Sequence, residues 1–193
     1  MYTELLQDVR FYEVLLRVDG DIAEGAREEG CPDCGGVLHS ASYPRKPRGA
    51  RCVLPGGYDR RFSFCCDEEG CRHRQTPASV RFLGRRVYLG GVVVLASAMQ
   101  NGVTPVRAAR LRELFGASVQ TLARWRIWWM EAFLESDFWK AARAQFSPPV
   151  DDRQAPSTLL GRFNGDAEEK MLALLRLICP LSTSSGYVAD RRV

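Results

Sequence analysis

The cysteine spacing constrains this chain more than any other feature of its sequence. In "CPDCGG", Cys31 and Cys34 are separated by two residues, and "FCCDEEGCRH" supplies further thiols about thirty residues later. Two turns that each supply two thiolates can bind one tetrahedral zinc ion, and the ion then holds the two turns together. The spacing therefore predicts a small β module built around a metal ion.

The second ligand pair can be Cys66 with Cys71 or Cys65 with Cys71. Knuckles with two to four intervening residues are usual, which favours Cys66. Neighbouring residues of a strand point to opposite faces, so Cys65 and Cys66 can hardly bind the same ion. Cys65 and His73 remain alternatives to Cys66. The predicted ligands are Cys31, Cys34, Cys66 and Cys71.

A closed four-thiolate site predicts a structural ion, because a catalytic zinc keeps a coordination position open. A redox dithiol is the rival interpretation of Cys31 and Cys34, but no βαβ pattern surrounds them. The sequence has neither a Walker loop nor the zinc-deaminase motif, and only two histidines. We therefore expect one structural Zn²⁺, no small-molecule substrate and no enzymatic activity.

The patterning predicts an α+β protein that is mainly α. Amphipathic helices are expected over 3–28, with a break at Asp19-Gly20, and strands over 35–43, 50–55 and 60–66. Further helices are expected at 87–100, 105–115, 119–134, 137–145 and 166–178.

Four segments follow from this pattern. They are an N-terminal helical segment (1–30), a zinc-ribbon-like β module (31–86), a helical domain (87–146), and a linker with a C-terminal helix and tail (147–193). The tail from Leu181 lacks an apolar period and is expected to be disordered.

Residues 101–129 predict a helix-turn-helix. Thr104-Pro105 is a strong helix start, Gly116 ends the helix, and Ser118 caps the next one. The inward-facing positions would be Val106, Ala109, Leu111 and Leu114 or Phe115 in the first helix, and Val119, Leu122, Trp125 and Trp129 in the second. The residues expected to contact bases are Gln120, Thr121 and Arg124, and those expected to hold phosphates are Arg107, Arg110 and Arg126. An ordinary helical bundle with a basic face is the alternative.

The charge distribution favours a nucleic-acid partner for the middle of the chain. Residues 1–30 hold three Arg and eight acidic residues, a net charge of −5, whereas residues 40–126 hold sixteen Lys or Arg and five acidic residues, a net charge of +11. The basic loop, residues 44–51 ("PRKPRGAR"), could grip the DNA backbone. Its cations are Arg45, Lys46, Arg48 and Arg51, and Arg81, Arg85 and Arg86 extend the basic strip.

The phrase "FCCDEEGCRHRQTP" followed by "RLRELFGASVQTLARW" resembles the zinc-ribbon and helix-turn-helix DNA-binding region of bacterial insertion-sequence transposases and their accessory proteins. The resemblance covers about residues 31–131. The 62 residues after it are too few and too helical for an RNase H-like catalytic domain. The resemblance therefore implies a transposition accessory factor that acts beside a separate transposase chain.

The sequence thus predicts a zinc-stabilised, sequence-specific protein that binds double-stranded DNA. A transcriptional regulator with the same parts is one alternative. A protein-interaction adaptor that uses the ribbon, the Trp-rich helices and the apolar anchors Leu172, Leu175 and Ile178 is another. With no apolar run long enough to span a bilayer and no basic N-terminal leader, a cytoplasmic location is expected.

Overall fold

The computed structural model describes residues 2–84, 88–98 and 105–183, and within them not the side chains of Thr3, Ala96, Arg107 and Ala108. The predictions for Arg85, Arg86, Thr104 and the tail from residue 184 lie outside these ranges. The expectation that the tail is disordered from Leu181 is wrong at its start, because Leu181 and Ser182 are buried in a 3-10 turn. The helical elements are α1 (Tyr2–Leu5), α2 (Val9–Glu28), α3 (Gly90–Ala98), α4 (Pro105–Phe115), α5 (Val119–Ile127), a π-helical turn (Trp128–Ala132), α6 (Phe133–Glu135), α7 (Asp137–Ala142), a 3-10 turn (Arg143–Gln145), a second (Asp152–Gln154), α8 (Ser157–Leu160), α9 (Ala167–Ile178) and a last 3-10 turn (Cys179–Ser182). The strands are β1 (Leu38–Ser40), β2 (Tyr43–Pro44), β3 (Arg60–Arg61), β4 (Phe64–Cys66) and β5 (Arg74–Gln75).

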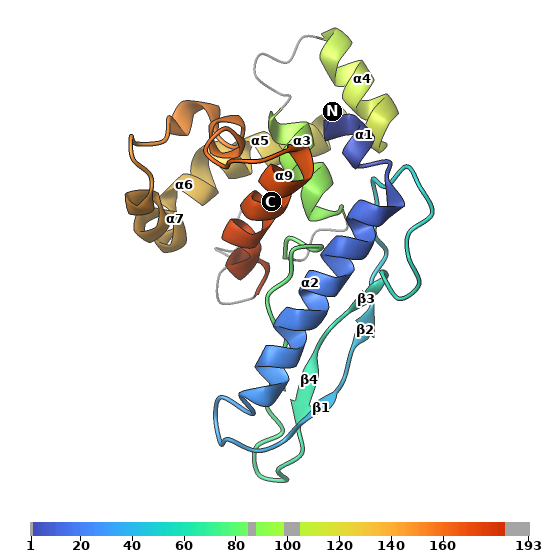
Figure 1. Cartoon of the computed structure of the whole chain (residues 1–193), viewed down its shortest axis with the longest axis vertical. Helices are drawn as coiled ribbons and strands as arrows, with labels where there is room; N and C mark the ends of the chain where they lie inside the picture. Colours follow the sequence, from blue (N-terminus) through green and yellow to red (C-terminus); the bar gives the residue numbers. More distant parts are fainter. Residues whose placement is uncertain (1, 85–87, 99–104, 184–193) are drawn as a thin grey trace.

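Helix α2 connects the two ends of the molecule. Its 20 residues make it about 30 Å long. The strands run beside α2, and the helices from α3 to α9 gather around its N-terminal end (Figure 1). The cysteine-bearing turns lie at the opposite end, beyond β1 and β4. The predicted α+β class with mainly helical content is confirmed.

The predicted break at Asp19-Gly20 is wrong, because α2 runs through it. Asp19 is 1% exposed. Its carboxylate accepts hydrogen bonds from the Ser79 hydroxyl, from the Val80 N–H at 2.7 Å and from Arg81 Nε at 2.7 Å. Asp is a residue type common in turns, but Asp19 is a buried hydrogen-bond acceptor that holds residues 79–81 against α2.

Arg81 completes this buried network. Its Nη1 donates to the Tyr58 carbonyl at 2.9 Å and its Nη2 donates to the Arg60 carbonyl at 3.0 Å. The guanidinium lies 5.1 Å from the ring centroids of Tyr58, Phe62 and Phe82. Arg81 was expected to extend the basic surface, but its side chain is fully buried, so this cation is internal.

The strands form two small antiparallel sheets, one ordered β1-β4-β5 and one pairing β2 with β3. The register places Leu38 opposite Cys66 and Phe64 opposite Gln75. The strand predicted over 50–55 is wrong, since this stretch is irregular. Val53 in it is 88% exposed, whereas Ala50, Cys52 and Leu54 pack partly buried against the main core without pairing to a strand. Strand β5 was not predicted.

The buried residues form a large cluster at the helical end and a small one near the cysteines. The large cluster takes side chains from all four predicted segments, such as Phe11, Tyr58, Trp129 and Leu174. Leu38, Phe64 and Cys66 belong to the small cluster. Within the described residues, no helix combines the length and the apolar character that crossing a membrane requires.

Candidate metal centre and basic surface

The metal centre begins where α2 ends. Gly30 follows the helix with φ +78°. The Cys31 N–H then donates to the Gly36 carbonyl at 2.9 Å, and the Gly35 N–H donates to the Cys31 carbonyl at 2.8 Å. Gly35, directly after the second ligand, has φ +74°, a backbone conformation that glycine adopts without strain. This tight turn directs Cys31 and Cys34 toward the end of β4.

The structure brings the four predicted ligands together. The Sγ atoms of Cys31, Cys34, Cys66 and Cys71 all lie within 4.8 Å of one another. Cys31 Sγ is 3.6 Å from Cys71 Sγ, and Cys34 Sγ is 3.5 Å from Cys66 Sγ. Zn–S bonds of about 2.3 Å in a tetrahedron place sulfurs ~3.8 Å apart. The cluster therefore has the size and the donors of a four-thiolate metal site.

Backbone N–H groups surround these sulfurs in a repeated pattern. Each sulfur receives a hydrogen bond from the N–H two residues later, the donors being Asp33, Gly36, Glu68 and His73. Burial raises the pKa of the Cys31 thiol, but the N–H groups of Asp33 and Cys34 and the Cys71 thiol outweigh this and lower the pKa to about 7. Burial raises the pKa of Cys66. These N–H groups would orient and stabilise metal-bound thiolates.

Gly36 is a site residue that sequence reasoning missed. A Cβ at this position would lie 3.2 Å from Cys66 Sγ, 3.3 Å from Cys34 Sγ and 2.6 Å from Glu68 Cγ. A side chain here would clash with Glu68 and crowd both sulfurs, so the backbone of the first turn lies close to them. The second glycine of "CPDCGG" was the signal for this contact.

The alternative ligands lie outside the cluster. Cys65 Sγ points to the other side of β4, 3.9 Å from the Arg72 carbonyl. His73 Nδ1 lies 2.6 Å from the Asp33 carboxylate. Phe64 and Cys66 are buried on one face of the strand, as alternation predicted. The structure thus favours Cys66 over Cys65 and His73 as the fourth ligand.

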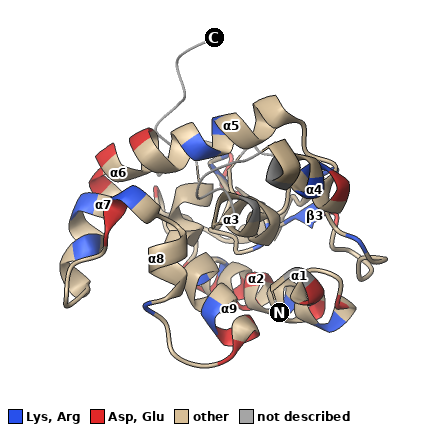
Figure 2. Ribbon diagram, turned by 90° about the horizontal axis from the view of Figure 1, so that it is seen from above, with Lys and Arg blue, Asp and Glu red and all other residues tan. Residues whose placement is uncertain are grey.

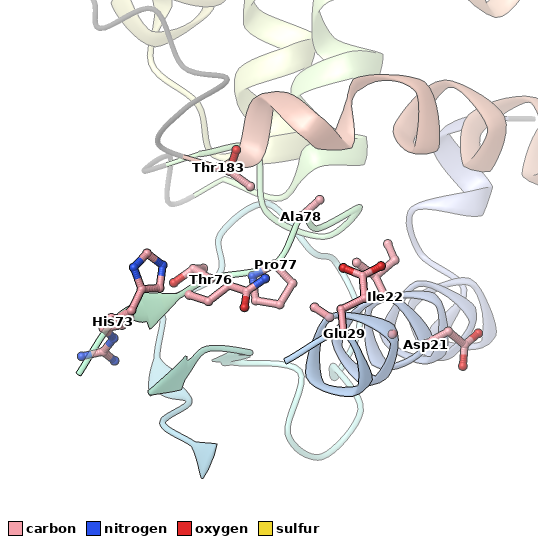
Figure 3. A pocket seen from close by; sticks show the side chains of 12 residues that line it. Asp21, Ile22, Glu29, His73, Thr76, Pro77, Ala78 and Thr183 are labelled. Carbon is pink, nitrogen blue, oxygen red and sulfur yellow. The ribbon is translucent and has the colours of Figure 1, made fainter. Parts of the chain in front are cut away.

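A cavity of about 630 Å³ lies beside the metal centre, between α2 and residues 73–78. Figure 3 shows Asp21 and Ile22 of α2, with Glu29 just after the helix, on one wall and His73, Thr76 and Pro77 on the other. Acidic and basic groups are mixed in this lining.

Within the described parts of the chain, the four cysteines form the group of His, Cys, Asp or Glu side chains whose ligand atoms lie close enough together to hold one metal ion.

Helices α4 and α5 lie at the other end of the molecule, where the turn 116–118 joins them. Gly116 has φ +63°, and the Ser118 hydroxyl accepts from the Thr121 N–H at 3.2 Å, as predicted. Leu122 and Trp125 face inward. Val119 is 58% exposed, so its inward assignment is wrong.

The same correction applies to α4. Val106 is 78% exposed and Ala109 is also exposed, whereas Leu111 and Phe115 are buried. Both helices are short and only weakly amphipathic, so packing against α3 decides which side is covered.

The predicted DNA contacts on α5 lie on its outer side. Gln120, Arg124 and Arg126 are exposed. Thr121 is half-buried, and its hydroxyl lies 3.0 Å from that of Ser118 and accepts from Arg124 Nη2 at 3.3 Å. On α4, Arg110 is exposed, and the side chain of Arg107 is not among those that the structure describes. Figure 2 shows Lys and Arg on α5 and on the side where α4 and β3 lie.

The cations of the basic loop differ in their contacts with the rest of the protein. Arg45 lies over the Phe82 ring at 5.5 Å and donates to the Gly84 carbonyl at 3.3 Å. Lys46 and Arg48 are exposed. Arg51 Nη2 donates to the Glu113 carbonyl in α4. The loop is therefore attached to the helical end of the molecule, away from the metal centre.

Comparisons with protein-family models, curated proteins and solved structures gave no match.

Proposed function

We propose that this protein is a sequence-specific binder of double-stranded DNA, stabilised by one structural zinc ion, in which α4 and α5 act as a helix-turn-helix. The observation that carries the proposal is the outer side of α5. A capped N-terminus places Gln120 and Arg124 on an exposed face, while Leu122 and Trp125 hold the helix to the core. The first turns of such a helix are the part that enters the major groove.

The residue chemistry supports base readout at this face. A Gln side chain can bond adenine bidentately and an Arg side chain can bond guanine. Arg110 and Arg126, both exposed, would contact phosphates on either side. Thr121 holds Ser118 and Arg124 in place, so its proposed role is to orient the neighbouring base contact.

We assign zinc to the four-cysteine cluster because its donors are all thiols and its spacing fits a tetrahedron. The ion would supply folding free energy to a part of the chain with a small apolar cluster of its own. Four protein ligands leave no position for a substrate, so the proposed role is structural and non-catalytic.

The resemblance to transposase DNA-binding regions adds that the protein serves a mobile element beside a separate catalytic chain. A transcriptional regulator would use the same surfaces, and the location of the bound sites distinguishes the two. Two of the three anchors of the adaptor alternative, Leu175 and Ile178, are each 1% exposed and belong to the core. The third, Leu172, is partly buried.

The test is selection of duplexes from a random-sequence library and from genomic fragments by the zinc-loaded protein. The wild type should enrich a defined motif, and Gln120→Ala with Arg124→Ala should lose it. Arg176→Ala, an exposed cation on α9, is the matched control and should keep the motif.

Each outcome decides a part of the proposal. Genomic fragments that cluster at the ends of repeated elements support the mobile-element role, and clustering at promoters supports a regulator. Absence of any enrichment by the wild type would refute DNA recognition. Enrichment of the same motif by the α5 variant would refute α5 as the recognition helix.

A further inference from the structure

The basic loop is seated on the helical domain through its own backbone. The Leu89 N–H, just before α3, donates to the Arg48 carbonyl at 3.1 Å, and Arg48 and Tyr88 form a parallel bridge. Gly49 has φ +97°, and a Cβ there would lie 2.8 Å from a methyl carbon of Val92. The loop therefore lies against α3 at a distance that only glycine allows at this point.

Two side chains extend this attachment to the turn before α5. The Tyr88 hydroxyl donates to the Gly116 carbonyl at 3.1 Å, and its ring meets Trp125 edge-on at 5.0 Å. Arg51 donates to the Glu113 carbonyl near the end of α4. Contacts of the loop thus reach α4, the turn and α5 together.

These contacts give the loop cations different roles. Arg45 is directed inward over Phe82, and Arg51 is bonded to α4. Lys46 and Arg48 are exposed on the loop that is attached beside the turn. The loop that carries them is joined to the turn before α5 through Tyr88 and to α4 through Arg51. A sugar-phosphate strand borders the groove that a recognition helix enters, so cations on such a loop can reach it.

We propose that Lys46 and Arg48 form a fixed backbone clamp that contacts one phosphate strand of double-stranded DNA beside the groove occupied by α5. The clamp rests on the proposed function, since it requires α5 to face DNA. Because the loop is already held by Arg51, Tyr88 and the Arg48 carbonyl, little ordering accompanies binding. Its contacts are to phosphates and carry no sequence information.

The experiment measures binding of zinc-loaded protein to a random-sequence duplex and to the selected duplex, from roughly 50 mM to 200 mM salt. The variant is Lys46→Gln with Arg48→Gln, which removes the two charges and keeps polar side chains of similar length. Lys140→Gln with Arg143→Gln removes two exposed cations from α7 and the 3-10 turn that follows it, on another side of the molecule, and is the control (Figure 2).

The clamp predicts that the slope of log K against log salt falls in magnitude by about 1.8, which is roughly 60-fold in affinity near 0.1 M salt. The ratio of affinities for the selected and random duplexes should stay the same. Far-UV circular dichroism and zinc content verify folding. If the double variant does not fold, Lys46→Gln alone should lower the slope by about 0.9.

Two results overturn the clamp. If the wild type binds the selected duplex and the clamp variant keeps the slope of the control, the clamp is wrong and the proposed function stands. If the wild type binds neither duplex, the clamp and the proposed function fail together.

Discussion

The buried pair of Asp19 and Arg81 allows the sharpest prediction about stability. Both side chains are fully buried, and the Asp19 carboxylate accepts three hydrogen bonds from the segment 79–81. Asp19→Asn keeps the shape of the side chain, but it removes the charge opposite Arg81. The amide NH₂ would also face groups that now donate to a carboxylate oxygen.

Breaking a buried ion pair by removing one partner costs about 3–5 kcal/mol. For a chain of 193 residues, this lowers Tm by roughly 6–20 °C. Asp21→Asn, an exposed acid on the same helix, is the control and should change stability by less than about 0.5 kcal/mol.

The assay is urea unfolding of zinc-loaded protein, followed by far-UV circular dichroism and by fluorescence. The four Trp residues lie in α5, the π-helical turn and α7, so fluorescence reports the helical end. Both signals should shift together, because Asp19 joins α2 to the segment that leads into the helical end. A loss below about 1 kcal/mol for Asp19→Asn would refute the reasoning.

Three further predictions concern single residues. Cys66→Ser should lose stoichiometric zinc, whereas Cys65→Ser should keep one ion per chain; metal analysis after gel filtration measures both, and equal losses would contradict the ligand choice. Ser118→Ala removes the N-cap of α5 and should lower the free energy of unfolding in urea by about 1 kcal/mol. An unchanged free energy of unfolding would contradict the capping role. Burial raises the pKa of Cys179 to about 11, so its thiol should react slowly with iodoacetamide near neutral pH, and the stability that this burial contributes should decline as pH rises from 9 toward 11. Fast alkylation of native protein at Cys179, mapped by mass spectrometry, would contradict this.

Local chemistry in the sequence was enough for much of the metal centre. The spacing of Cys31 and Cys34, with the alternation along the strand before Cys71, identified the four clustered thiols. Chelate spacing and strand alternation act over a few residues, so distant contacts hardly change them. The sequence did not reveal how closely Gly36 approaches the sulfurs, because that distance involves a residue of β4.

Local signals also determined the ends of the helices around the proposed recognition element. Pro105, Gly116 and Ser118 set the predicted boundaries of α4 and the start of α5, and the structure has them there. Capping needs only the groups of the first and last turns. The sequence alone therefore determined where α4 begins and ends and where α5 begins, but not that α5 gives way to a π-helical turn after Ile127.

Only the tertiary structure decided which charged groups are inside. Asp19 and Arg81 form a buried ion pair, Asp19 lies within a continuous α2, and Arg45 lies over the Phe82 ring. The tertiary structure also leaves Val119 exposed, although the sequence pattern predicted that it faces inward. Burial of a charge depends on whether a distant residue supplies its partner, and the covered face of a weakly amphipathic helix depends on its neighbours. Neither can be read from a few adjacent residues, because both are properties of contacts across the fold.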